Sequence, residues 1–199
     1  MLGGNNMNKY EEIKKIIKKN NGILYAKDIA SNNINRHYVR ELEENGYIKR
    51  IVHGIYAVAD KDVNEFWIMS QRYQKGIFSH NTALYFYGLT DRTPLKFDMT
   101  FPSNIRVNNE YMRPHYIKEN KHTMGETLLE IEPNVEIKIY DIERTICDII
   151  RDKNKIDPQI FNTAMKEYSK MKNKKLHLLY EYAKEFNIED KLQQYMEVL

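Results

Sequence analysis

The sequence predicts an α+β fold in two domains, over residues 1–60 and 61–199. Two observations predict it: apolar residues recur at helical spacing near both ends of the chain, whereas segments in its middle alternate between apolar and polar residues. A chain of 199 residues can form two small hydrophobic cores. A short polar stretch over residues 59–64 marks the expected linker.

The first domain is expected to contain three helices followed by two short strands. The third helix starts at its cap Asn35, ends at Asn45-Gly46 and turns Val39 and Leu42 toward the core. Helix, helix, turn, helix and β-hairpin is the order of a winged helix-turn-helix. The expected helices are residues 8–20, 26–31 and 35–45, and the expected strands are residues 47–48 and 54–58.

Positive charge concentrates in this first domain. Residues 1–59 hold ten Lys or Arg and six Asp or Glu, whereas the rest of the chain holds 21 and 22. A small basic module attached to a nearly neutral one is what a phosphate-binding module joined to a second domain would look like. We therefore expect the first domain to bind nucleic acid.

Six basic side chains are the candidate DNA contacts. With Val39 and Leu42 turned inward, the residues at the start of the third helix lie on its outer surface, where such helices meet base edges in the major groove. Residues of the hairpin can reach phosphates or the minor groove. The alternative is that all six are ordinary solvated charges. The candidates are Arg36, His37 and Arg40 on the helix and Lys49, Arg50 and His53 in the hairpin.

The second domain is expected to form a mixed sheet covered by helices and to end in a helical C-terminal segment. Ser79 is expected to cap a helix that ends at Gly88, and Pro102 to close a half-buried strand. Asp141 and Asp157 are expected to begin two of the C-terminal helices. The expected strands are residues 76–78, 96–101, 111–117, 127–132 and 135–140, and the expected helices include residues 65–73, 79–88, 176–186 and 188–196.

Three motifs follow one another in the chain: residues 50–56 (RIVHGIY), 79–90 (SHNTALYFYGLT) and 141–148 (DIERTICD). Together with the basic winged helix they resemble the AbiEi antitoxin family of bacterial type IV toxin-antitoxin systems, over about residues 8–190. The resemblance implies a DNA-binding domain that represses its own operon at repeated promoter sites. It also implies a second domain that counteracts a nucleotidyltransferase-like toxin.

The wing departs from the family pattern at one position. The family's wing usually reads Arg-Gly-Val-Tyr where this chain has His53-Gly54-Ile55-Tyr56. This difference implies a phosphate contact that is weaker or that depends on protonation of His53.

A second basic cluster lies in the C-terminal half. Its lysines repel one another unless an acidic surface or nucleic acid compensates them, so we expect the cluster to meet the toxin or nucleic acid. The alternative is a solvated helix end, where lysines suit the helix dipole. The cluster comprises Lys166, Lys170, Lys172, Lys174 and Lys175.

The motifs predict no enzyme. Ser79 and His80 are adjacent at a strand-to-helix junction and are expected to be a cap and a hydrogen-bonded polar side chain rather than a nucleophile and its base. Arg144 and Asp148 lie four residues apart, so a direct ion pair is expected. The chain has no Gly-rich phosphate loop, and the spacing of its histidines predicts no metal site, so we expect no cofactor.

Two other functions stay open. A metal-dependent nuclease would use Glu136 and Lys138, two apart on one predicted strand, with Glu130 or Glu132 as a further ligand. A transcription factor whose second domain senses a ligand is the other.

The expected partners are double-stranded promoter DNA and the toxin. A single small winged helix offers limited interface, so we expect a chain that can be monomeric in solution to bind repeated sites cooperatively. The sequence contains no run of about 18 apolar residues, so we expect no membrane span, and residues 1–6 lack the apolar core of a signal peptide. The single cysteine, Cys147, excludes an intramolecular disulfide and indicates a reducing cytoplasm.

Overall fold

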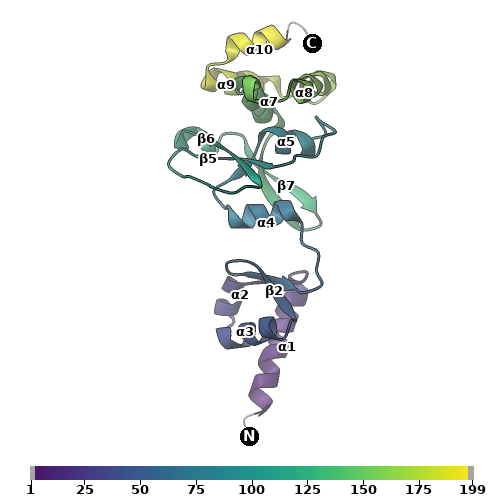
Figure 1. Ribbon diagram of the computed structural model, residues 1–199, viewed down its shortest axis with the longest axis vertical. Coiled ribbons are helices and arrows are strands. Elements are labelled where there is room, and N and C mark those ends of the chain that lie inside the picture. The colour runs from purple at the N-terminus through teal and green to yellow at the C-terminus, as the bar shows by residue number, and fades with distance from the viewer. Residues whose placement is uncertain (1–2, 197–199) are drawn as a thin grey trace. The chain divides into compact units, whose positions relative to one another are not determined.

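The computed structural model describes the backbone of residues 3–196 and the side chains of residues 9–196 (Figure 1). The chain forms two compact units, Met1–Arg72 and Tyr73–Leu199, here called unit 1 and unit 2. Both units contain helices and strands, which confirms the predicted α+β class. Within the described residues, no helix has both the length and the hydropathy of a membrane span.

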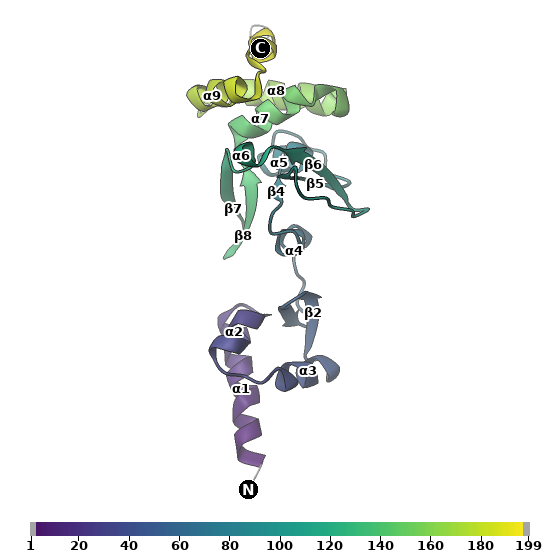
Figure 2. The ribbon, with the colours of Figure 1, turned by 90° about the vertical axis from the view of Figure 1, so that its left-hand side faces the viewer.

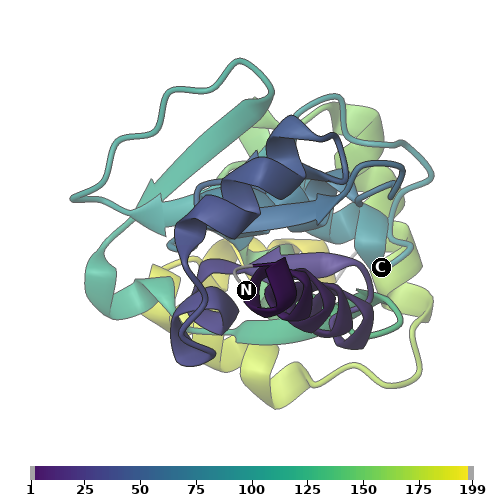
Figure 3. The same cartoon turned by 90° about the horizontal axis from the view of Figure 1, so that it is seen from below.

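Unit 1 combines helices with a three-stranded antiparallel sheet of order β1-β3-β2. Its core gathers apolar residues from α1, α2, α3 and the sheet around Ile13, Leu24 and Ile48. Figure 3 looks along α1, which is seen close to end-on. The elements are α1 (Gly3–Lys19), β1 (Ile23–Tyr25), α2 (Ala26–Ser31), α3 (Arg36–Glu44), β2 (Ile48–Val52), β3 (Ile55–Val58) and α4 (Glu65–Arg72).

Helix α3 forms for the local reasons that the sequence indicates. The Asn35 side chain accepts a hydrogen bond from the His37 backbone N–H at 2.9 Å and so satisfies one free donor of the first turn. Val39 and Leu42 are buried on one side of the helix. After the helix, Gly46 adopts a φ of +69°, a left-handed conformation that glycine takes without strain.

The strands of unit 1 differ from the prediction in two places. Strand β2 extends through Val52, where the sequence predicted a connecting segment, because residues 48–52 pair with β3 across a bulge after Arg50. Strand β1 was not predicted, since three residues are too short to show a periodicity. Its place is set by pairing with the other edge of β3, where Ile23 lies opposite Ala57.

Unit 2 is built on a mixed five-stranded sheet of order β6-β5-β4-β8-β7. The pairs β4–β8 and β5–β6 are parallel, and the other two pairs are antiparallel. The strands are β4 (Ile77–Phe78), β5 (Phe97–Pro102), β6 (Met112–Ile117), β7 (Glu126–Glu132) and β8 (Val135–Tyr140). The helices are α5 (His80–Phe86), α6 (Glu119–His122), α7 (Ile142–Arg151), the 3₁₀ turn η1 (Lys153–Lys155), α8 (Pro158–Lys170), α9 (Leu176–Phe186) and α10 (Glu189–Met196).

The last four helices gather at one end of unit 2 (Figure 2). Helix α7 is buried along most of its length and packs against α5, α8 and α9, with Ile146 and Ile149 in the shared core. Asp141 caps α7 by accepting from the Arg144 backbone N–H at 2.7 Å, and Asp157 caps α8 in the same way. These two helix starts lie where the sequence predicts them.

Two predicted details of unit 2 are wrong. The Ser79 side chain makes no cap bond to α5, because its hydroxyl is occupied by Thr100 and His80. Strand β5 is buried from Asp98 onward rather than half-buried, since it lies inside the sheet. Pro102 belongs to β5, and it is tolerated there because it lies beyond the end of β4 and has a neighbouring strand on one side only.

Candidate nucleic-acid interface

One concave surface of unit 1 gathers most of the candidate DNA contacts. Helix α3 and the β2–β3 hairpin form its two sides, and it encloses about 500 Å³. Five of the six candidates line it, namely Arg36, His37, Arg40, Arg50 and His53. We call it the α3–hairpin surface. Only three residues separate the end of α3 from the start of β2, and the turn between them brings the helix and the hairpin to one surface.

The α3 side of this surface is exposed. The side chains of His37 and Arg40 are 66% and 77% exposed, and Arg36 is exposed as well. His37 and Arg40 each face a glutamate one helical turn later, with Nε2 of His37 at 3.4 Å from Glu41 and Nε of Arg40 at 2.7 Å from Glu44. Exposed pairs of this kind contribute little, so both basic groups can leave their glutamates for a phosphate.

The hairpin side carries a direct contact between two candidates. Nη2 of Arg50 donates to Nδ1 of His53 at 2.8 Å, which orients the guanidinium across the turn. The turn itself requires Gly54, whose φ is +76° and where a Cβ would lie 3.3 Å from the Cβ of Ala26. The glycine of the RIVHGIY motif therefore serves the close approach of the hairpin to α2.

Lys49 lies apart from the other five candidates. Successive residues of a strand point to opposite faces, and Lys49 pairs with the buried Ala57 whereas Arg50 pairs with Tyr56. Lys49 is exposed but does not line the α3–hairpin surface. Arg50 and Lys49 thus form a natural comparison of two adjacent cations on opposite faces.

The lysine cluster of unit 2 spans the end of α8 and the start of α9. Two of its members have local partners: Lys170 pairs with Glu167 at 2.6 Å, and Lys174 donates to the Ser169 carbonyl. Lys166, Lys172 and Lys175 are exposed. Lys170 is exposed as well, so four of the five lysines are accessible to solvent.

The residues of the nuclease alternative lie on β7 and β8. Glu136 and Lys138 lie on the exposed side of β8, and Lys138 pairs with Glu126 at 3.0 Å. Glu136 lies opposite Glu130 in the strand register. In the part of the chain that the structure describes, neither glutamate belongs to a group of three possible metal ligands.

The buried motif 141–148 is held by an ion pair, as expected. Nε of Arg144 lies 3.2 Å from Asp148, and both side chains are 0% exposed. The guanidinium stacks on Tyr140 and Phe186 at 3.9 and 4.5 Å from their ring centroids. The role of these residues in the fold is structural, because no part of either side chain reaches solvent.

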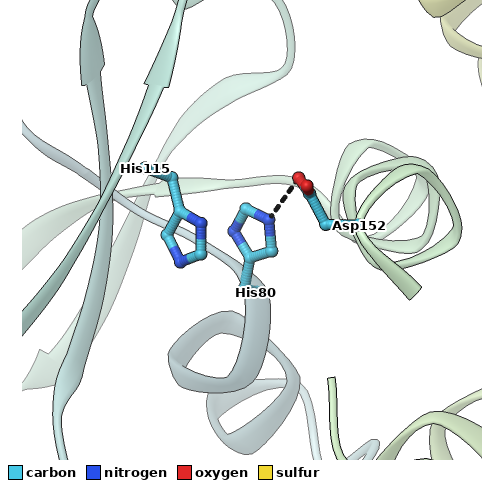
Figure 4. Close-up of side chains that lie close together, drawn as sticks. All are labelled: His80, His115 and Asp152. Atoms are coloured by element: carbon cyan, nitrogen blue, oxygen red, sulfur yellow. Dashed lines mark hydrogen bonds and ion pairs between the residues drawn. The ribbon is translucent and has the colours of Figure 1, made fainter. Parts of the chain in front are cut away.

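A cluster that sequence analysis missed lies in unit 2. His80, His115 and Asp152 come together from α5, β6 and the end of α7 (Figure 4). The two imidazole rings stack at 3.6 Å, and Nε2 of His80 lies 3.4 Å from Asp152. The hydrogen bond from His80 lowers the pKa of Asp152, and burial lowers the pKa of His115. No sequence signal points to the cluster, because each member is at least 35 positions from the next along the chain.

Comparison with protein-family models and with curated proteins finds no match for this chain. The resemblance to the AbiEi family therefore stays a prediction that rests on the three motifs and their order.

Proposed function

We propose that this chain is an antitoxin of a type IV toxin-antitoxin system that also represses its own operon. In this proposal unit 1 is a winged helix-turn-helix that binds promoter DNA, and unit 2 counteracts a nucleotidyltransferase-like toxin without catalysis. One observation carries the DNA-binding half: five candidate basic residues from α3 and the hairpin line a single concave surface.

The proposed binding mode follows from the two sides of that surface. Helix α3 enters the major groove with its first turn, so that Arg36 and Arg40 reach base edges or phosphates. The β2–β3 hairpin lies beside it as the wing and places Arg50 near the backbone. A bidentate arginine contact with guanine contributes about 1–3 kcal/mol of discrimination, whereas a phosphate contact adds affinity that salt weakens.

The test is a fluorescence anisotropy titration of the full chain with the duplex upstream of its own gene. Arg36→Ala and Arg40→Ala are expected to weaken binding by about 5-fold to 150-fold, the equivalent of about 1–3 kcal/mol, and to relax sequence preference if they read a base. Arg50→Ala is expected to lower the salt slope by about 1. Lys49→Ala, the adjacent cation on the opposite face of β2, is the matched control and is expected to bind like the parent.

Two outcomes would contradict the DNA-binding proposal. The first is no change in the anisotropy of the duplex even at low ionic strength. The second is a loss of affinity as large in Lys49→Ala as in Arg50→Ala, because the binding surface would then not be the one formed by α3 and the hairpin.

The antitoxin half is supported by the exposed lysines at the α8–α9 junction. We propose that Lys166, Lys172 and Lys175 meet an acidic surface or nucleic acid while unit 2 acts on the toxin. The test applies when the reading frame next to its gene encodes a nucleotidyltransferase. That protein is expressed in bacteria, and the growth of the culture is measured with and without the full chain. A triple change of these lysines to glutamine is expected to lose rescue while promoter binding is retained.

A matched control changes three exposed lysines elsewhere in unit 2, Lys118, Lys184 and Lys191, to glutamine. This control removes the same charge and is expected to rescue growth like the parent. Equal rescue by both triple variants would indicate that the cluster is an ordinary solvated surface. The absence of a toxic neighbour would remove the antitoxin proposal and leave DNA binding to be judged by itself.

A further inference from the structure

Three separated segments of unit 2 place possible metal ligands at one point. His80 is the first residue of α5, His115 lies within β6, and Asp152 follows the last residue of α7. One ligand atom of each lies within 4.8 Å of the others, and the close-up in Figure 4 shows the three side chains converging. Among the residues that the structure describes, no other group of three His, Cys, Asp or Glu side chains meets this condition.

The outer nitrogens of both histidines have fixed partners, as metal-bound histidines do. Nε2 of His115 lies 2.7 Å from Oδ1 of Asp98, a carboxylate that is 1% exposed. Nδ1 of His80 lies 3.0 Å from Oγ of the buried Ser79. A carboxylate or hydroxyl that accepts from the outer N–H leaves the lone pair of the other ring nitrogen for a metal. The Asp98 contact leaves Nδ1 of His115 as its donor, and Nε2 of His80 becomes a donor once the proton that it shares with Asp152 is released to solvent.

The backbone conformation of His80 also favours a binding site at this cluster. His80 has a φ of +46°, a left-handed conformation that costs a non-glycine residue free energy. The residue is nevertheless 0% exposed and held from both sides, by Ser79 and by Asp152. Ser79 is in turn fixed by the Thr100 hydroxyl at 2.8 Å. Strained residues held in this way cluster at binding and catalytic sites.

The charge around Asp152 can adapt to a cation. Asp152 pairs with Arg151 at 3.1 Å and with Lys155 at 2.8 Å. The Lys155 side chain is 74% exposed, so it can turn to solvent at little cost when a metal takes its place. The side chains of His115 and Asp152 are 13% and 15% exposed, which gives the cluster an opening to water.

We propose that His80, His115 and Asp152 bind one Zn²⁺ ion, with water as the fourth ligand. Two imidazoles and one carboxylate are donors that zinc accepts, whereas Mg²⁺ and Ca²⁺ require oxygen ligands. The stacked rings lie at 9° to one another, so binding requires the two imidazoles to shift until Nδ1 of His115 and Nε2 of His80 face one ion, with the Asp98 carboxylate moving along with Nε2 of His115. The ion would tie α5, β6 and the α7–η1 junction together and stabilise unit 2. This proposal is independent of DNA binding.

The test measures zinc binding by the full chain after treatment with EDTA. Titration with ZnCl₂ against a chromophoric chelator is expected to show one bound equivalent for the parent, and zinc is expected to raise its melting temperature. His115→Gln and Asp152→Asn are expected to weaken that site by 100-fold or more. Asp98→Asn, which removes only the partner of His115, is expected to weaken it by about 10-fold to 100-fold.

His177→Gln is the matched control, since His177 is an exposed histidine on α9, away from the cluster in sequence. It is expected to bind zinc like the parent. Circular dichroism of each metal-free variant checks its folding, and the visible spectrum of the Co²⁺-loaded parent supplies a test that needs no variant, because nitrogen and oxygen donors in a four-coordinate site give intense visible bands. The proposal is overturned if the parent binds no equivalent, if the folded His115→Gln and Asp152→Asn variants bind like the parent, or if cobalt stays six-coordinate.

Discussion

Replacing Arg144 with methionine is expected to destabilise unit 2 by about 5 kcal/mol. Arg144 is 0% exposed and lies between the rings of Tyr140 and Phe186. Its guanidinium donates to Asp148 at 3.2 Å and to the backbone carbonyls of Lys121 and Met124 at 3.1 and 2.5 Å. Methionine keeps most of the volume between the rings but provides none of these hydrogen bonds.

The magnitude follows from what the substitution leaves behind. Removing one partner of a buried ion pair costs about 3–5 kcal/mol, because the other charge stays buried without compensation. Asp148 keeps one cation, Arg151 at 3.0 Å, so the lower value of about 3 kcal/mol applies. The two carbonyls that lose a donor add about 1 kcal/mol each. The sum is a large fraction of the total stability of a domain of this size.

Urea unfolding with two probes measures this effect. The only tryptophan, Trp67, is buried in unit 1, so its fluorescence reports on that unit, whereas far-ultraviolet circular dichroism follows both units. The Arg144→Met variant is expected to lower the midpoint of the transition assigned to unit 2 and to leave the fluorescence transition in place. Arg144→Lys retains a charge without the planar fork, so its unfolding midpoint is expected to lie between those of the parent and of Arg144→Met.

A double variant tests the physical reason. If the cost arises from the stranded carboxylate, Arg144→Met combined with Asp148→Leu is expected to be more stable than the sum of the two single losses predicts, by at least about 1.5 kcal/mol. Strict additivity, or a loss below about 1 kcal/mol for Arg144→Met alone, would refute the reasoning.

Four further outcomes are expected. Burial lowers the pKa of His122 below its ordinary value of 6.5, so folding favours the neutral ring. The contribution of His122 to the free energy of unfolding is fully present above pH 6.5 and is lost as the pH falls below that value. His122→Gln should therefore reduce the loss of stability between pH 7 and pH 5, measured by urea unfolding. Burial raises the pKa of the Cys147 thiol to about 12, so Ellman's reagent should label it at the rate of unfolding, and rapid labelling of the folded chain would contradict this assignment. Gly125→Ala should cost about 2–4 kcal/mol by urea unfolding, because the φ of +75° is strained for alanine and its Cβ would lie 2.6 Å from that of Arg144; a neutral effect would show that the segment can shift. Asn35→Ala removes the cap of α3 and should cost about 1 kcal/mol in the Trp67 fluorescence transition, whereas an unchanged midpoint would mean that water replaces the cap.

The candidate site was accessible to sequence analysis only in part. The spacing of Val39 and Leu42 fixes which side of α3 is buried, and hence that Arg36, His37 and Arg40 are exposed. The separation of Lys49 from Arg50 depends on strand β2, which the sequence predicted only up to residue 48. The alternation of side chains across β2 then places the two cations on opposite faces.

The sequence by itself determined the features that arise within a few residues of one another. Helix starts at Asn35, Asp141 and Asp157 are such features, because a cap bonds to backbone N–H groups two or three positions away. Only the tertiary structure decided the pairing of β1 with β3, the burial of β5 and the meeting of His80 with His115 and Asp152. The physical reason is that sheet order and side-chain clusters depend on contacts between residues tens of positions apart, which leave no periodic pattern along the chain.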